Sequence, residues 1–244
     1  MKYAIILPER RYKMKKPIIG IVAKRGIVPD MWQYMEIVDN IRYVLVKNGA
    51  LVVGVLPSDR KLEFKKDEEE DPNPLTKEEL EDLDAIIARL DGVILEGGLV
   101  SSKYEEEIAR ICIEKDIPLM GICSGFNNLV RALGGRVHID KTIFHNQFGM
   151  KIAHDIDIKE DSLLYEILKT SRVTVNSIHT CIANEDEING YKVVARCPND
   201  GTVEAFELEN KRFVMGIKWH PELMETMNPI FERFIEECRC TKHD

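Results

Sequence analysis

The sequence predicts an α/β fold built on a parallel sheet, to which shorter antiparallel strands are added. Apolar β-type runs alternate with segments of helical periodicity from residue 17 to about residue 135. After that point the runs become short and alternating, with turns between them, which favours antiparallel strands. The chain then closes with an amphipathic segment at residues 228–238, which predicts a final helix.

The first strand–helix–strand unit sets the parallel direction of the sheet. The apolar run 17–23 follows a proline, and a helix is predicted over residues 32–48 because Ile37, Ile41, Val44 and Leu45 recur at helical spacing. Asn48-Gly49 ends this helix, and a second apolar strand follows at residues 50–56. A strand, a helix and a strand at this pitch form a βαβ unit, whose two strands are parallel.

The elements downstream are predicted in the same way. Residues 58–79 are charged and proline-punctuated, which indicates a solvated loop and the start of a helix capped near Thr76. Neither an internal repeat nor a linker is visible, so we expect a single domain over residues 1–244. The remaining predicted strands and helices cover 91–98, 103–115, 117–122, 125–133, 155–158, 172–179, 192–197, 202–208 and 212–220.

Bulk composition excludes several classes of protein. The chain has 244 residues, 44% of them hydrophobic, and a net charge of -8, which argues against nucleic-acid or membrane-surface binding because neither suits an acidic protein. The longest apolar runs are far shorter than a membrane span, and the N-terminus lacks the pattern of a signal peptide. We therefore expect a cytoplasmic protein.

The six cysteines include no CxxC pair, and a disulfide framework is not expected. Cys238, Cys240 and His243 could suggest a metal site, but an ordinary chain terminus is the preferred interpretation.

The strongest chemical signal is the segment PLMGICSGFNN, in which Cys123 stands between Gly121 and Gly125. An apolar strand runs directly into a helix here, which is the cysteine form of a nucleophile elbow. The helix N-terminus favours a thiolate, and the amide of Ser124 is a candidate oxyanion donor. A buried structural cysteine beside two packing glycines is the alternative.

A second signal follows the last strand, where the sequence reads His220-Pro221-Glu222. A carboxylate two residues from an imidazole can accept its ring N–H and stabilise the imidazolium. Alone, this motif is typical of a surface turn. Together with Cys123, it predicts a nucleophile with its base and orienting carboxylate.

These residues resemble the class I glutamine amidotransferase superfamily, and most closely its γ-glutamyl-γ-aminobutyrate hydrolase and γ-glutamyl hydrolase branch. The resemblance extends from about residue 16 to residue 238. Four stretches carry it: DGVILEGG (91–98), GICSGFNN (121–128), VNSIH (175–179) with DGTVEAFE (200–207), and GIKWHPE (216–222).

The resemblance implies a flavodoxin-like, mostly parallel sheet with helices on both faces. It implies a triad of Cys123, His220 and Glu222, and an oxyanion hole formed by the amides of Gly98 and Ser124. The implied chemistry is thioester formation at a γ-glutamyl carbonyl, followed by hydrolysis. No metal or organic cofactor is required by that chemistry.

The resemblance also suggests where the substrate binds. The candidates are Gly97, Asn127, Asn176, Ser177 and His179. From the residues alone, Gly97-Gly98 could be a simple turn, and His179 is as compatible with a structural role as with the glutamyl site. Glu204 is interpreted as a strand residue at the outer wall of the site.

Four positions depart from the pattern of the branch. Asn127 replaces a longer Gln or Glu, Thr180-Cys181 replaces His-Gln, and Glu96 replaces a proline before the glycine pair. The substrate-covering loop expected after Gly98 is missing, which predicts an open pocket or a lid supplied by the charged segment 58–79.

Three functions are consistent with the sequence. The first is a stand-alone hydrolase of a small γ-glutamyl amide or peptide. The second is a glutaminase subunit that passes ammonia to a synthetase partner, which would need an exposed apolar surface near the pocket. The third is a catalytically weak regulatory homologue. A homodimer is left open, and no nucleic-acid or membrane partner is expected.

Overall fold

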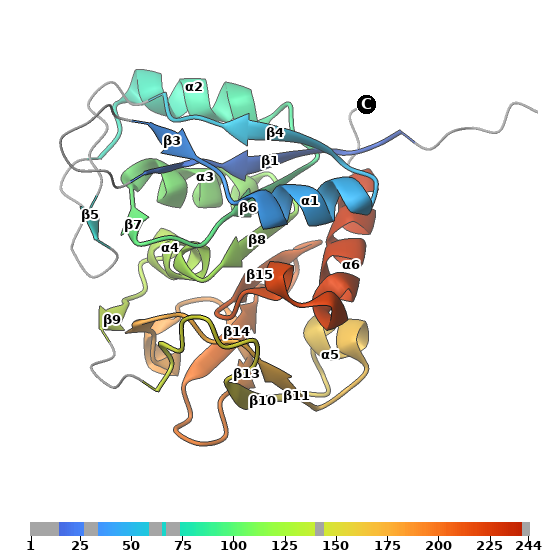
Figure 1. Ribbon diagram of the computed structural model, residues 1–244. Helices are drawn as coiled ribbons and strands as arrows, with labels where there is room; N and C mark the ends of the chain where they lie inside the picture. Colours follow the sequence, from blue (N-terminus) through green and yellow to red (C-terminus); the bar gives the residue numbers. More distant parts are fainter. Residues whose placement is uncertain (1–14, 27–33, 59–64, 67–73, 140–143, 241–244) are drawn as a thin grey trace, which may run out of the picture.

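The computed structural model describes residues 15–26, 34–58, 65–66, 74–139 and 144–240. Its centre is a nine-stranded sheet with the strand order β11-β10-β13-β14-β15-β8-β6-β1-β4. Figure 1 shows the N-terminal strands at one end of this sheet and the antiparallel strands at the other.

Five strands form the parallel half of the sheet, and the register pairs β1 with β4 and β6, β6 with β8, and β8 with β15. Four of these strands are buried, and buried parallel strands need the near-continuous apolar sequence that they supply. The strand Leu51–Val55 lies at the edge of the sheet and leaves Leu51 and Val53 exposed. The bounds of the five strands are β1 (Ile18–Val22), β4 (Leu51–Val55), β6 (Gly92–Leu95), β8 (Leu119–Ile122) and β15 (Val214–Ile217).

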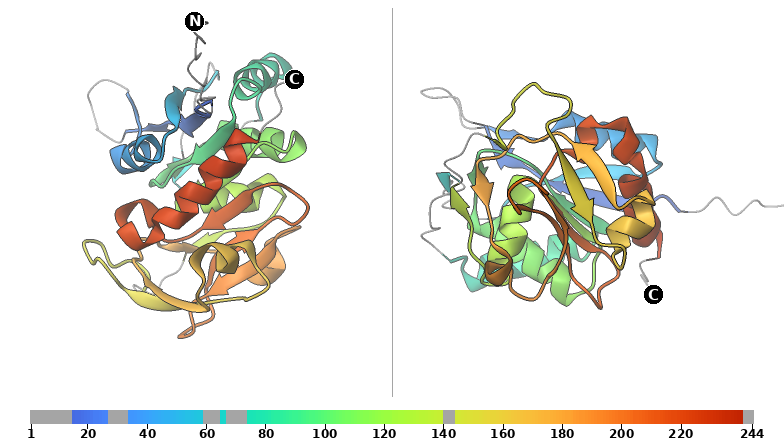
Figure 2. Two further views of the ribbon diagram at one scale, coloured as in Figure 1. Left: turned by 90° about the vertical axis from the view of Figure 1, so that its right-hand side faces the viewer. Right: turned by 90° about the horizontal axis from the view of Figure 1, so that it is seen from below.

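The other four strands extend the sheet by antiparallel pairing, beginning with β14 against β15. In the left view of Figure 2, they lie below the parallel half. The expected antiparallel additions therefore gather at one end of the sheet. Their bounds are β10 (His154–Ile158), β11 (Arg172–Val175), β13 (Lys192–Arg196) and β14 (Val203–Glu207).

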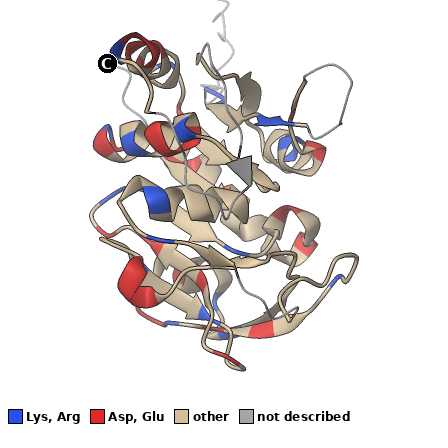
Figure 3. Ribbon diagram, turned by 90° about the vertical axis from the view of Figure 1, so that its left-hand side faces the viewer, with Lys and Arg blue, Asp and Glu red and all other residues tan. Residues whose placement is uncertain are grey.

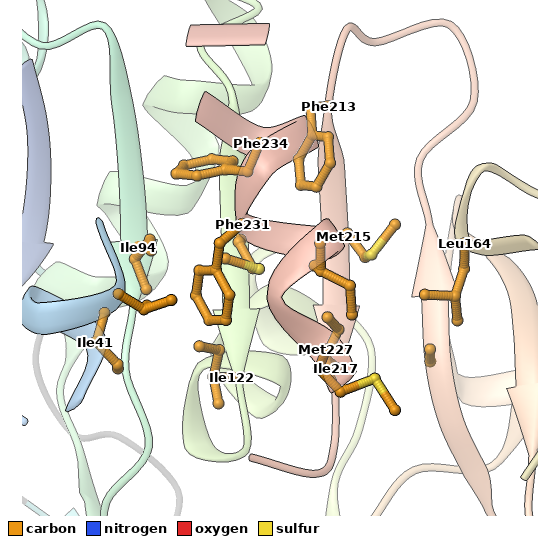
Figure 4. Close-up of a cluster of buried hydrophobic side chains, with 14 of the residues drawn as sticks. Ile41, Ile94, Ile122, Leu164, Phe213, Met215, Ile217, Met227, Phe231 and Phe234 are labelled. Atoms are coloured by element: carbon orange, nitrogen blue, oxygen red, sulfur yellow. The ribbon is translucent and has the colours of Figure 1, made fainter. Parts of the chain in front are cut away.

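Helices cover both faces of the sheet, as expected. One face carries α1 (Asp39–Lys47), α5 (Leu163–Leu168) and α6 (Asn228–Arg239), whose apolar side chains join one hydrophobic cluster. Figure 4 shows part of this cluster, where Phe231 and Phe234 of α6 pack near Ile94 and Met215 of the sheet. The other face carries α2 (Lys77–Ile87), α3 (Lys103–Glu114) and α4 (Ser124–Ala132), which enclose a second cluster.

In the part of the chain that the structure describes, three short strand pairs lie at the carboxyl edge of the parallel half and in the region next to it. The most informative pair joins β5 to β7, because it brings part of the charged segment 58–79 beside the residues that follow Gly98. The lid proposed for this segment otherwise lies largely outside the described residues. The pairs are β2 (Lys24–Arg25) with β3 (Met35–Glu36), β5 (Lys65–Lys66) with β7 (Val100–Ser101), and β9 (His138–Ile139) with β12 (Cys181–Ile182).

Several boundaries differ from the sequence-based predictions. The helix predicted over residues 32–48 begins only at Asp39, because Met35–Glu36 pair with β2 as a strand instead. Residues 32 and 33 lie outside the described part, as does His243. The cap predicted near Thr76 is confirmed. The Thr76 hydroxyl accepts the Glu79 N–H at 3.3 Å, and the Glu79 carboxylate accepts the Thr76 N–H. Helix α5 was not predicted.

Within the described part of the chain, basic and acidic side chains are mixed along the helices (Figure 3). Among the helices that the structure describes, none combines the length and the apolarity needed to cross a bilayer.

Candidate active site

The candidate residues gather at the carboxyl end of the parallel strands, where the chain leaves β6, β8 and β15 side by side (Figure 1). Gly97 and Gly98 follow β6, Cys123 follows β8, and His220 follows β15. Ligand sites of open α/β sheets lie at this edge, because neighbouring parallel strands deliver their next residues to one place.

Cys123 occupies a strained turn between β8 and α4. Its backbone φ of 51° and ψ of -100° are unusual for a residue with a Cβ, and it stands at the N-cap of α4. The side chain is 7% exposed, and Sγ lies 3.7 Å from the carbonyl oxygen of Ile178. This turn points the sulfur away from the sheet while leaving it partly accessible, which is the geometry expected of a nucleophile elbow.

The flanking glycines are required by close packing rather than by flexibility. A Cβ at Gly125 would lie 2.1 Å from the carbonyl oxygen of Leu95, and one at Gly121 would lie 2.5 Å from the carbonyl oxygen of Gly125. A Cβ at Gly97 would lie 2.7 Å from the ring of His220. The missing side chains therefore allow α4 to pack closely against β6 and β8, and Gly97 to lie against the ring of His220.

His220 lies between Cys123 and Glu222. Its Nδ1 is 2.7 Å from Oε1 of Glu222, and its ring hydrogen-bonds Cys123 on the other side. Burial acts to lower the pKa of His220, but the charge and hydrogen bond of Cys123, together with those of Glu222, outweigh burial and raise that pKa. The raised pKa favours the imidazolium form of His220.

Asn176 fixes the backbone at His220. Its Nδ2 donates to the His220 carbonyl at 2.8 Å, and its Oδ1 accepts the His220 N–H at 2.8 Å. Asn176 was predicted to bind substrate, and that role stays a prediction. The observed contacts make Asn176 a residue that positions His220. They tie the segment after β11 to the loop after β15, two parts of the chain that are distant in sequence.

A pocket of about 320 Å³ opens beside the sulfur. Asn127 lies in its wall, and its Oδ1 accepts a hydrogen bond from the buried Lys218. The wall contains neither Ser177 nor Gly97. It is formed by Gly98, Leu99, Cys123, Asn127, Asn146, Phe148, Ile178, His179, Thr180 and Cys181.

The loop that carries Gly98 is braced by Lys24, which the sequence reasoning missed. The ammonium donates to Glu105 Oε1 at 2.6 Å, to the Val100 carbonyl at 2.9 Å and to Ser124 Oγ at 3.1 Å. The Lys24 side chain is 3% exposed and that of Glu105 is fully buried. One buried cation thus links the two segments predicted to carry the oxyanion donors. The feature of the sequence that could have indicated Lys24 is its position directly after an apolar strand.

Glu96, the departure from the usual proline, lies buried behind the glycine pair. Its Oε2 accepts the Val38 N–H at 2.8 Å. Burial raises the pKa of Glu96 to about 7, against the opposing influence of the Val38 hydrogen bond and of Lys24.

Ser177, His179 and Glu204 belong to a buried cluster under the pocket that also contains His145 and His154. Ser177 Oγ donates to the His145 carbonyl at 2.7 Å. His179 Nε2 lies 3.5 Å from Glu204 Oε1. Glu204 lies in strand β14, as expected, and its side chain is fully buried. His145 and His154 were missed because only long-range folding brings them together.

The fold and the strand–cysteine–helix turn define a class I glutamine amidotransferase-type α/β protein. The chain belongs to the Peptidase C26 family, whose profile matches residues 100–222. Among curated relatives, the gamma-glutamyl-gamma-aminobutyrate hydrolase PuuD of Escherichia coli is 28% identical over 200 residues, which cover 64% of this chain and 75% of that protein.

CTP synthase of Chlamydia muridarum is 26% identical over 182 residues, which cover 61% of this chain. The chain spans about a third of that relative, 34% of its length. The glutaminase domain of Trypanosoma brucei CTPS, solved with bound acivicin, superposes with a TM-score of 0.66 at 17% identity, covering 94% of this chain and 96% of that one. This last likeness concerns the fold.

Proposed function

We propose that the protein is a cysteine-dependent hydrolase of γ-glutamyl amide or peptide bonds. The observation that carries the proposal is the hydrogen-bonded series Cys123–His220–Glu222 at the edge of a pocket. The family and the hydrolase relative support this reaction class.

In the first half-reaction, the Cys123 thiolate attacks the γ-carbonyl carbon and forms a C–S bond. The carbonyl oxygen becomes an oxyanion, for which the amides of Gly98 and Ser124 are the proposed donors. The His220 imidazolium then gives its proton to the leaving nitrogen as the C–N bond breaks. The amine leaves, and a thioester remains.

In the second half-reaction, His220 is neutral and accepts a proton from water, which attacks the thioester. The C–S bond breaks, glutamate leaves, and the thiolate–imidazolium pair returns. Glu222 holds Nδ1 throughout, so Nε2 faces the reacting atoms. In the pocket wall, Asn127 accepts a hydrogen bond from the Lys218 ammonium and is the proposed contact to the glutamyl group.

The test is a hydrolysis screen over γ-glutamyl amines, γ-glutamyl peptides and glutamine, read by released glutamate. Wild-type protein and Cys240→Ser should turn over at equal rates, because Cys240 is exposed and lies on the terminal helix cap. Cys123→Ala should remain folded and inactive. Activity retained in Cys123→Ala would refute the proposed nucleophile.

A second function is favoured by one specific observation. Apolar side chains are exposed around the pocket: Leu99 is 76% exposed and Phe148 is 85% exposed, and Met150, Ile152 and Leu223 are exposed nearby. Such a surface fits a glutaminase subunit that docks on a synthetase partner. Glutamate release from glutamine alone, and only after cell extract is added, would select this alternative over the stand-alone hydrolase.

The same screen decides the third candidate. A regulatory homologue would release glutamate from no compound, with or without extract, although its fold is intact.

A further inference from the structure

We propose that His145, His154, His179 and Glu204 form a tetrahedral Zn²⁺ site that holds the inner wall of the pocket. The four residues come from the loop before β10, from β10, from the loop after β11 and from β14. In the sheet, β13 lies between β10 and β14 (Figure 1). The proposal does not depend on the reaction that Cys123 performs.

The spacing of the candidate ligand atoms is the first argument. Glu204 Oε1 lies 3.4 Å from His145 Nδ1, 3.5 Å from His154 Nε2 and 3.5 Å from His179 Nε2. His145 Nδ1 lies 3.1 Å from His154 Nε2. In a tetrahedral site with Zn–ligand bonds of about 2.0–2.1 Å, neighbouring ligand atoms lie about 3.3–3.4 Å apart. Four edges of the expected tetrahedron are therefore close to their ideal lengths.

The outward-facing ring nitrogens give the second argument. His145 Nε2 contacts Asp200 Oδ2 at 2.8 Å, and His154 Nδ1 contacts the Asp155 carbonyl at 3.0 Å. A carboxylate and a carbonyl only accept hydrogen bonds, so these two outward nitrogens carry the protons. The inward nitrogens of the neutral rings then carry lone pairs. This is the arrangement by which outer partners orient histidines that ligate a metal.

Unsatisfied polar atoms give the third argument. Within the described residues, neither oxygen of Glu204 has a hydrogen-bond partner, and His179 Nε2 lies 3.5 Å from Glu204 Oε1. Glu204 and His145 are fully buried, and His154 and His179 are each 5% exposed. A buried carboxylate that faces three imidazole lone pairs is strongly unfavourable unless a positive charge lies between them. A cation at the centre satisfies all four groups together.

Lys218 is a cation outside the cluster that acts electrostatically on Glu204 and His179. Its ammonium donates a hydrogen bond to Asn127 Oδ1 and lies over the Phe126 ring, 4.7 Å from the ring centroid. Its positive charge partly offsets the negative charge of Glu204.

The donor set selects the ion. Three imidazoles and one carboxylate suit Zn²⁺ among the common divalent metals, whereas Mg²⁺ and Ca²⁺ prefer oxygen ligands. Four protein ligands in a closed site indicate a structural ion. Its effect on the pocket would pass through His179, which follows Ile178, the residue whose carbonyl faces the Cys123 sulfur.

The experiment measures metal content and does not require activity. Purified wild-type protein should contain close to one zinc per chain by plasma mass spectrometry. His138→Asn is the matched control, because His138 is exposed and contacts Glu187 outside the cluster, and it should retain the zinc. Glu204→Gln and His154→Asn should lose it. Asp200→Asn, which alters an outer partner, should weaken zinc binding about 10–100-fold.

Co²⁺ provides a readout that does not rely on variants folding. The chelator-treated wild-type chain should bind one Co²⁺ and develop the visible bands of a tetrahedral ion, with no sulfur-to-cobalt charge-transfer band. Such a band would place the ion on Cys197, which lies beside His145 and Asp200, and would overturn the assignment. Uptake of neither metal by the wild-type chain would also overturn it, and would indicate that a shared proton holds the histidines together.

Discussion

Replacement of Lys24 by methionine tests whether a buried ion pair supports the loop that carries Gly98. Methionine keeps most of the length of the side chain but removes the three hydrogen bonds of Nζ. Glu105 would keep its bonds from the Ser102 N–H at 2.9 Å and from Asn128 Nδ2 at 2.9 Å, but it would remain as an uncompensated buried charge. Breaking a buried pair in this way costs about 3–5 kcal/mol.

The assay is the free energy of unfolding from urea denaturation. Lys24→Met should lose about 3–5 kcal/mol, whereas the double variant Lys24→Met/Glu105→Gln should recover a large part of that loss because the buried charge is gone. Lys103→Met is the matched control: its partner is Glu106 and its side chain is 25% exposed, so its loss should be within about 1 kcal/mol.

Two results would contradict the stabilising role of the Lys24–Glu105 ion pair. One is a Lys24→Met variant as stable as Lys103→Met. The other is a double variant no more stable than Lys24→Met, which would mean that the charge of Glu105 is not the source of the loss.

Three further predictions concern Glu96, Asn176 and Thr76. Because the folded-state pKa of Glu96 is raised from 4.5 to about 7, the unfolded chain ionises first, and wild-type stability should fall as pH rises through that interval. Between these pH values, the free energy of unfolding of the wild-type protein should fall by about 3 kcal/mol more than that of Glu96→Gln, as measured by urea denaturation. Equal pH slopes for both proteins would contradict this. Asn176→Ala should lower kcat about 10–100-fold with KM little changed, because His220 loses both backbone anchors; a change confined to KM would instead indicate substrate binding. Thr76→Ala should cost about 1 kcal/mol of stability through loss of the cap on α2, and an unchanged urea midpoint would argue against it.

Local patterns predicted most of the fold. The apolar runs became β1, β6 and β8, because a buried strand needs an uninterrupted apolar sequence. The apolar run of β4 was also predicted as a strand, although it lies at the exposed edge of the sheet. Helix α5 was missed because six residues supply too little periodicity to detect. The start of α1 was misplaced because the pairing of β3 with β2 is a tertiary contact that overrides local helix propensity.

The site was predictable where its residues follow strands. Cys123 and His220 each stand directly after an apolar run, so their common edge could be inferred from the sequence. The contacts of Asn176 and the cluster around Glu204 could not, because they join positions far apart in the chain through side-chain geometry alone. Lys24 was missed because a lysine after a strand is ordinarily exposed, and only the buried Glu105 makes its burial favourable.

The central claim is that Cys123 is the nucleophile. The most direct measurement is peptide mass spectrometry of the protein after brief treatment with an electrophilic glutamine analogue. We expect one adduct on Cys123, because burial raises the pKa of the thiols of Cys112, Cys197 and Cys238, while Cys240 is not among the residues that line the pocket beside Cys123. Cys240→Ser should give the same adduct in the same yield. An adduct on Cys181, Cys197 or Cys240 in place of Cys123 would contradict the account.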